Sequence, residues 1–174
     1  MKRTFCALFA AAVLVLSFAS CGEPKSYAEI LIEQTDGWSL SAATSNPTYI
    51  MYSGAPVDNL MEGYLAACEL DDIITFKEGG IMTIDPGTNI AEGFGYQGVV
   101  SGTWNISPDQ TTLNMQLPIF YDATDMMYDQ TPESCKIISI TSKEMVLEYS
   151  FNDNESPAKG EYTFTFTYAP AKRK

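Results

Sequence analysis

Carboxylates are the side chains of this chain that could carry out acid–base chemistry, because the sequence contains no histidine. Without histidine, the Ser-His-Asp and Cys-His arrangements of hydrolases are excluded. Two facing carboxylates can still hydrolyse a glycosidic bond, and Asp71 and Asp72 form the obvious pair. Adjacent residues of a strand point to opposite faces, however, so we expect Asp71 to cap or end a turn. The sequence therefore predicts no catalytic residue and a protein that is not an enzyme, with a carbohydrate-active enzyme as the alternative.

Oxygen atoms of the kind that calcium binds occur close together at Asp85, Gly87, Asn89 and Glu92. Their spacing does not match the EF-hand pattern, and an ordinary solvated turn explains them. No pair of cysteines has the spacing of a zinc site, and there is no histidine to assist. We therefore expect no metal and no cofactor.

The first residues have the layout of a secretory leader. Lys2 and Arg3 give a basic start, and residues 5–18 form an almost unbroken apolar run. A short basic region followed by a short apolar region is typical of a signal peptide. The run is shorter than the ~20 apolar residues that a membrane-spanning helix needs, so we expect the protein to be exported.

Cys21 follows this run and is the residue expected to be chemically modified. The small residues Ala19 and Ser20 stand directly before it, and this arrangement resembles the lipobox of bacterial lipoproteins. The resemblance implies that residues 1–20 are a lipoprotein signal peptide and that Cys21 receives a diacylglycerol and a further acyl chain, which together anchor a protein stably to a membrane. Gly22 is not the aspartate that signals retention in the inner membrane, so an outer-membrane anchor is expected, on the periplasmic or the surface face. An ordinary secretory cut after Ala19 is the alternative.

The chain is strongly acidic, with a formal net charge of −12. Nucleic-acid binding depends on lysine and arginine side chains that neutralise phosphates, so we expect no nucleic-acid partner. The same charge opposes binding to a bare anionic membrane, so lipid must supply the attachment. The simplest role of the charge is solubility.

Cys68 and Cys135 are the cysteines that remain after Cys6 leaves with the leader and Cys21 is lipidated. In an exported protein, two such cysteines can form a disulfide. Alternatively, each behaves as a small buried hydrophobic residue. Their spacing does not decide between the two.

Alternation of apolar and polar residues predicts roughly nine or ten short strands. One stretch, residues 57–68, has apolar residues at helical spacing instead and is expected to form one short amphipathic helix. The expected strands are 38–42, 48–52, 71–77, 81–85, 96–101, 102–106, 112–117, 135–141, 144–151 and 160–168.

Many short sequential strands favour an all-β fold, either a small antiparallel meandering barrel or a sandwich. A barrel is preferred because closure leaves no exposed strand edge. We expect residues 21–35 to be the lipidated N-terminus and tether, residues 36–169 the barrel domain, and residues 170–174 a basic tail.

Five short blocks of the sequence together resemble the lipocalin-like lipoproteins of Bacteroidetes-type bacteria, over about residues 36–168. The resemblance implies a small antiparallel β-barrel, and the function of that family is largely uncharacterised. Its members often carry a second cysteine shortly after the first hairpin, but residues 86–92 contain none, which leaves Cys135 as the possible partner of Cys68. The blocks are Gly37-Trp38, residues 67–76, Gly102-Thr103-Trp104, residues 137–141 with 145–147, and residues 162–166.

Aromatic residues provide the candidate ligand-binding side chains. They either line a ligand cavity, as in lipocalins, or form plain barrel core. A second candidate is the long acidic segment around Met126, Met127 and Tyr128, which is either a contact loop for a partner or ligand or an ordinary acidic loop. The candidate cavity residues are Trp38, Trp104, Tyr162, Phe164, Phe166 and Tyr168.

The sequence therefore predicts a non-enzymatic binding module, lipid-anchored in the outer membrane, for a small apolar or glycan ligand. The alternative is an accessory envelope lipoprotein with a filled barrel that contacts other proteins.

Overall fold

The computed structural model describes residues 24–90, 97–116, 132–154 and 157–172. The expected leader, Cys21, Glu92 and the segment from Met126 to Tyr128 lie outside the described residues. Among the residues that the structure describes, no helix has the length and apolar character needed to cross a lipid bilayer.

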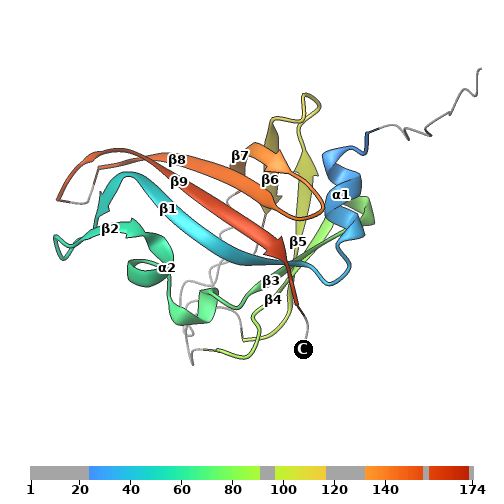
Figure 1. Cartoon of the computed structure of the whole chain (residues 1–174), viewed down its shortest axis with the longest axis horizontal. Helices are drawn as coiled ribbons and strands as arrows, with labels where there is room; N and C mark the ends of the chain where they lie inside the picture. Colours follow the sequence, from blue (N-terminus) through green and yellow to red (C-terminus); the bar gives the residue numbers. More distant parts are fainter. Residues whose placement is uncertain (1–23, 91–96, 117–131, 155–156, 173–174) are drawn as a thin grey trace, which may run out of the picture.

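The described chain folds as an antiparallel β-barrel (Figure 1). Eight strands form the closed ring, because β1 pairs with β9 as well as with β3. The additional strand β2 pairs with the second half of β1, outside the ring. The prediction of an all-β antiparallel barrel is confirmed. The strands are β1 Trp38–Ile50, β2 Pro56–Asn59, β3 Ile73–Lys77, β4 Ile81–Asp85, β5 Val100–Ile106, β6 Thr112–Gln116, β7 Pro132–Ile140, β8 Met145–Asp153 and β9 Gly160–Pro170.

The β3–β4 hairpin shows how local sequence fixes a turn. Gly79 and Gly80, within the 3-10 turn η2 Glu78–Gly80, have φ angles of 76° and 74°, a region that glycine enters without steric cost. At Gly80 a Cβ atom would lie 2.9 Å from the carbonyl oxygen of Trp104. Both glycines are therefore required, by conformation or by contact.

The expected strands 38–42 and 48–52 are one long strand, β1. This strand contains Pro47, which cannot donate a hydrogen bond to a neighbouring strand. The structure accommodates it where both ladders are interrupted. The pairing with β9 ends at Asn46, and the pairing with β2 is irregular between Thr44 and Tyr49.

The prediction of one helix over residues 57–68 is wrong. The segment forms β2, the four-residue helix α2 Leu60–Gly63 and the 3-10 turn η1 Ala67–Glu69. Val57 and Leu60 are both buried, but they reach the interior from different elements. We call residues 56–69 the excursion, because the chain here leaves the ring between β1 and β3.

One end of the barrel is closed by the helix α1 Tyr27–Glu33, which lies within the range expected to be a tether. Ser26 and Glu29 form a capping box: the Ser26 hydroxyl accepts from Glu29 N (3.3 Å), and Glu29 Oε2 accepts from Ser26 N (2.7 Å). Leu31 is fully buried in the core beside Trp38. The helix therefore forms because its start is capped and its apolar face covers the barrel end.

Two apolar clusters fill most of the barrel. The first lies next to α1 and contains both tryptophans; the Trp104 indole N–H donates to the carbonyl oxygens of Lys77 (3.2 Å) and Ile81 (3.0 Å). The second cluster is aromatic and lies between the excursion and the strands β1, β8 and β9. It contains Tyr49, Tyr162 and Phe164.

The ends of the domain are tied to each other. β9 runs to Pro170, and Ala171 N donates to Gly37 O (2.8 Å). Ala171 is buried. The first two residues of the expected basic tail are therefore part of the barrel.

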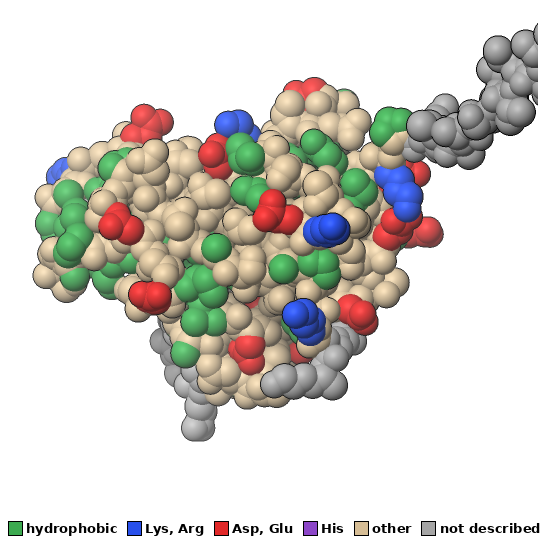
Figure 2. Space-filling view, in the orientation of Figure 1, with side chains coloured by type: hydrophobic (Ala, Val, Ile, Leu, Met, Phe, Trp, Pro, Cys, Tyr) green, Lys and Arg blue, Asp and Glu red, His purple; other side chains and the backbone are tan. Residues whose placement is uncertain are grey.

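The surface carries its charge in a dispersed form. Figure 2 shows acidic side chains spread over the face in view rather than gathered in one patch, and hydrophobic side chains grouped at the end where β1, β8 and β9 project in Figure 1. A dispersed acidic surface agrees with the expectation that the net charge serves solubility.

Candidate functional site

A cavity of about 230 Å³ lies inside the barrel. The ring strands supply most of its wall, and the excursion supplies its cover through Leu65 and Glu69. Seven of the nine side chains around it are apolar or aromatic. The lining residues are Leu40, Leu65, Glu69, Asp72, Ile74, Ile84, Met115, Phe166 and Tyr168.

Strand pairing brings these residues together from distant parts of the chain. Leu40 of β1 pairs with Tyr168 of β9, and Ile74 of β3 pairs with Ile84 of β4. Trp38, one inward position before Leu40, pairs with Ile74 and is fully buried. The cavity is therefore bounded on one side by the packed cluster that contains Trp38.

Asp72 brings a carboxylate to this mostly apolar wall. Its Oδ1 atom is buried and has no hydrogen-bond partner. Burial, which is the largest cause, and the neighbouring carboxylates of Asp71, Glu69 and Asp85 together raise the pKa of Asp72 to about 6. At neutral pH the side chain is therefore mainly ionised in surroundings that disfavour its charge.

Glu69 supplies the second carboxylate. Its Oε2 atom accepts a hydrogen bond from Ala66 N (2.6 Å), which fixes the side chain at the start of η1. Glu69 and Asp72 thus reach the cavity from the same short segment, which leads out of the excursion and into β3.

Asp71 has a different role from its neighbour. Its Oδ2 atom accepts from the backbone N–H groups of Thr88 (2.9 Å) and Asn89 (3.0 Å), which ties the start of β3 to the loop after β4. Gly87 lies so close that a Cβ atom there would be 2.6 Å from Asp71 Oδ2. The expectation that Asp71 caps or ends a turn is confirmed, and Asp72 lines the cavity without Asp71.

The structure distributes the six aromatic candidates between core and cavity. Phe166 and Tyr168 line the cavity. The other four, Trp38, Trp104, Tyr162 and Phe164, are buried in the two apolar clusters.

Sequence reasoning considered Asp72 only as half of a catalytic pair. It did not identify six other cavity residues: Leu40, Leu65, Glu69, Ile74, Ile84 and Met115. The strand residues carry the ordinary apolar alternation of a barrel wall, which does not separate cavity from core. Leu65 was obscured by the incorrect helix over residues 57–68, and Glu69 directly follows that range.

The structure does not join Cys68 to Cys135. Cys68 is half-buried in η1, whereas Cys135 is buried on β7 in the cluster next to α1. Of the two states left open by the sequence, the structure has the two separate thiols.

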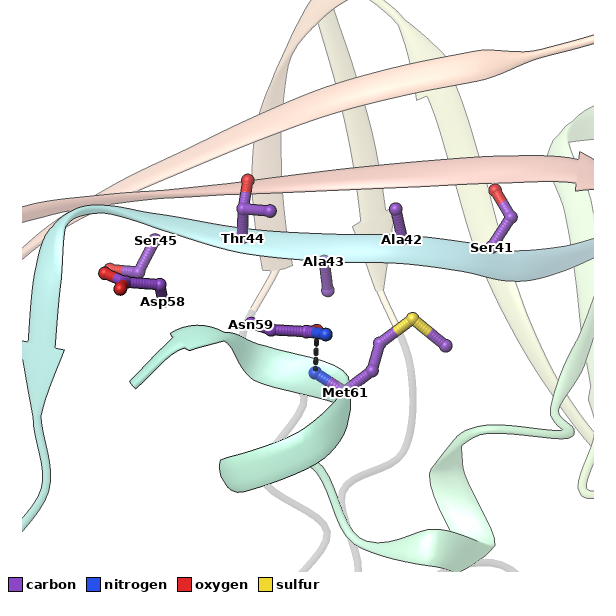
Figure 3. A pocket seen from close by; sticks show the side chains of 8 residues that line it. All are labelled: Ser41, Ala42, Ala43, Thr44, Ser45, Asp58, Asn59 and Met61. Carbon is purple, nitrogen blue, oxygen red and sulfur yellow. Dashed lines mark hydrogen bonds between the residues drawn. The ribbon is translucent and has the colours of Figure 1, made fainter. Parts of the chain in front are cut away.

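A second hollow, of about 510 Å³, lies outside the ring between β1 and the excursion (Figure 3). Asn59 points across it and caps α2, since its Oδ1 atom accepts from Met61 N (3.1 Å). Asp58 is held by the hydroxyl group of Thr48. This hollow is a wide groove open to solvent, and its acid and cap residues are engaged within the protein, so the interior cavity is the better candidate site.

Two carboxylates at one cavity are also the groups that glycosidases use. That reaction needs room for two joined sugar rings and polar partners for their hydroxyl groups. The small, mainly apolar cavity offers neither, so its geometry favours binding over catalysis.

Comparison with known families agrees with this architecture. The model of the lipocalin-like domain matches residues 36–147, which is more than half of the chain and includes most of the cavity wall. No curated protein matches the chain. With a closed antiparallel barrel, a hollow interior and this match, the chain belongs to the lipocalin-like domain family.

Proposed function

We propose that this protein is exported, is anchored by lipid in the outer membrane, and binds a small, mainly apolar molecule in the barrel cavity. The observation that carries the binding proposal is the hollow of about 230 Å³ between packed parts of the barrel. Lipocalin-like barrels are in general small-ligand binding modules rather than enzymes. A concave, mostly apolar site with a few polar groups is the usual form of such a module.

The size and lining of the cavity indicate the class of ligand. An engineered cavity of ~150 Å³ lined by Leu, Ile and Phe binds benzene. A cavity of about 230 Å³ therefore accommodates a molecule somewhat larger than one aromatic ring. A glycan would place several hydroxyl groups against apolar walls without hydrogen bonds, which is unfavourable, so an apolar ligand is favoured over a glycan.

The anchor proposal rests on Cys21 and the small residues before it in the sequence. The start of α1 at Tyr27 lies six positions after Cys21, and a fully extended chain of that length spans about 20 Å at most. An acylated Cys21 would therefore hold the barrel close to the membrane surface, with the closed end containing α1 nearest to the anchor.

Native mass spectrometry of the protein extracted from membranes tests the binding proposal. We expect a small bound molecule on the wild-type protein. The Leu65→Trp variant should lose it, because the larger side chain enters the cavity from its cover. The Ile138→Trp variant, which adds the same side chain at an exposed position of β7, should keep it. A wild-type protein without any ligand, but with a recurrent protein crosslinked to it in cells, would overturn the proposal in favour of the accessory envelope role.

Metabolic labelling with radioactive palmitate tests the anchor. The wild-type chain should carry the label and sediment with membranes, and the Cys21→Ser variant should do neither. A labelled Cys21→Ser variant, or an unlabelled wild-type chain, would contradict lipidation at this residue.

A further inference from the structure

We propose that the molecule held in the barrel cavity carries a positively charged amine, which the carboxylates of Asp72 and Glu69 receive while its apolar part contacts the remaining wall. This inference rests on the proposed binding function and specifies the chemical class of the ligand.

The first argument is the unpartnered oxygen of Asp72. Its Oδ1 atom is buried without a hydrogen bond, and the residue lines the cavity. Burying a carboxylate oxygen without a donor is unfavourable. Because that oxygen has almost no accessible surface, a ligand acts on the Asp72 carboxylate as a whole. A cationic N–H group in the cavity beside Asp72 would offset its uncompensated charge, and a charged donor forms a stronger bond with a carboxylate than a neutral one.

The second argument is the sign of the charges around the cavity. The groups that act on Asp72 are all acidic: Glu69 from η1, Asp71 beside it and Asp85 from β4. In the described part of the chain, the two salt bridges are Lys25–Glu33 and Lys136–Glu148, and neither includes a carboxylate of the cavity. The cavity therefore combines negative potential with no ion pair to neutralise Asp72 or Glu69, which favours a cation and opposes an anion.

The third argument is the division of the wall into two parts. Glu69 and Asp72 come from one short segment of the chain, whereas Phe166, Tyr168 and the aliphatic residues come from the ring strands. A ligand with one charged end and one apolar end matches this division. Neither a purely apolar molecule nor a polyhydroxylated one satisfies both parts.

Three small molecules of nearly equal shape test the charge requirement: 2-phenylethylamine, 2-phenylethanol and phenylacetate. Their affinities for the full acylated protein in neutral phosphatidylcholine nanodiscs are measured by calorimetry at pH 7.5, with empty nanodiscs as the blank. We expect the amine to bind at least tenfold more tightly than the alcohol, and the anion to bind most weakly.

Substitutions then assign the effect to the cavity. Asp72→Asn should reduce the affinity for the amine about tenfold and change the affinity for the alcohol less than twofold. Glu69→Gln retains an oxygen that can accept from Ala66 N and should weaken amine binding to a smaller extent. Glu144→Gln, an exposed acid in the β7–β8 turn, is the matched control and should change neither affinity.

The pH dependence of amine binding provides a second test of the site. Because the pKa of Asp72 is raised to about 6 by burial and by Asp71, Glu69 and Asp85, amine affinity should fall as the pH is lowered from 7.5 to 5, and alcohol affinity should not. Glu69 and Tyr168 are the other titratable residues on the wall, and the same measurement on Glu69→Gln separates the contribution of Glu69 to this pH dependence.

The outcomes separate the inference from the function that underlies it. If the alcohol binds as tightly as the amine, or if Asp72→Asn leaves the preference unchanged while the variant unfolds at or above the wild-type temperature, the charge requirement is refuted and the binding function stands. If none of the three molecules binds and no ligand is found on the native protein, the proposed function itself is refuted.

Discussion

Replacing Asp72 by asparagine should stabilise the protein at neutral pH. Burial, assisted by Asp71, Glu69 and Asp85, raises the pKa of Asp72 from 3.8 to about 6. A carboxyl group with a higher pKa in the folded than in the unfolded state destabilises the fold once it is ionised. At 1.36 kcal/mol per pKa unit the whole shift corresponds to about 3 kcal/mol, and partial exposure to solvent reduces the expected gain to about 1–2 kcal/mol.

The pH dependence identifies the cause of this gain. The stabilising effect of a protonated Asp72 is complete below pH 3.8 and is lost as the pH rises through about 6. The neutral asparagine does not lose it, so the two proteins should differ little near pH 4 and by the full amount at pH 7 and above.

Urea unfolding, followed by the fluorescence of the buried residues Trp38 and Trp104, measures these differences at pH 4, 5, 6 and 7.5. The Glu144→Gln variant is the control, and its difference from the wild type should not follow the same curve. An Asp72→Asn variant that is less stable than the wild type at pH 7.5, or whose gain is the same at every pH, would refute the reasoning.

Three further predictions concern the β3–β4 hairpin and the end of the barrel that α1 closes. Gly80→Ala should destabilise the protein by about 1 kcal/mol more than Gly79→Ala, because both have positive φ angles but only Gly80 lies against the carbonyl oxygen of Trp104; equal urea midpoints for the two variants would contradict this. Leu31 is fully buried, so Leu31→Ala should lower the free energy of unfolding by about 2–5 kcal/mol in chemical denaturation. A loss under about 1 kcal/mol would show that α1 does not close the barrel. Ser26→Ala removes the helix cap and should cost about 1 kcal/mol, whereas Ser26→Asp, which keeps a capping oxygen, should cost much less.

The strands were predictable where one face is buried and the other is wet. In β9, Tyr162 and Phe164 are buried and alternate with threonines, and in β6, Leu113 and Met115 alternate with polar residues. A period of two identifies such strands directly. The same rule explains why the barrel could be inferred before its closure was seen.

Residues 57–68 and the helix α1 show the limits of predicting structure from the periodicity of apolar residues. The apolar residues of 57–68 have helical spacing, but Val57 packs against Gly63. A Cβ atom added at Gly63 would lie only 3.1 Å from the Val57 side chain. Residues six apart do not share a face of one helix, so the chain must turn back here. In contrast, Ser26-Tyr27-Ala28-Glu29 contains the capping-box pattern, a signal in the sequence that predicts the start of α1.

The division between core and cavity could not be predicted from the pattern. Phe164 and Phe166 both occupy inward positions of β9, yet Phe164 is buried in the aromatic cluster and Phe166 lines the cavity. What separates them is the layer of the barrel in which each lies and the excursion that covers it. Those relations depend on pairing between strands far apart in the chain, which a local pattern does not contain.

The pairing of β1 with β9 has a consequence for how the protein folds during synthesis. The first and last strands of the ring lie against each other, from Trp38 with Pro170 to Asn46 with Thr163. The barrel wall therefore cannot be completed until β9 has been synthesised. Until then β1 and β8 each present an unsatisfied backbone edge, which is the surface on which other chains aggregate. Copies that lack β9 therefore leave these edges exposed, and closure of the ring depends on a contact between residues far apart in the chain, which is the kind of contact that slows folding.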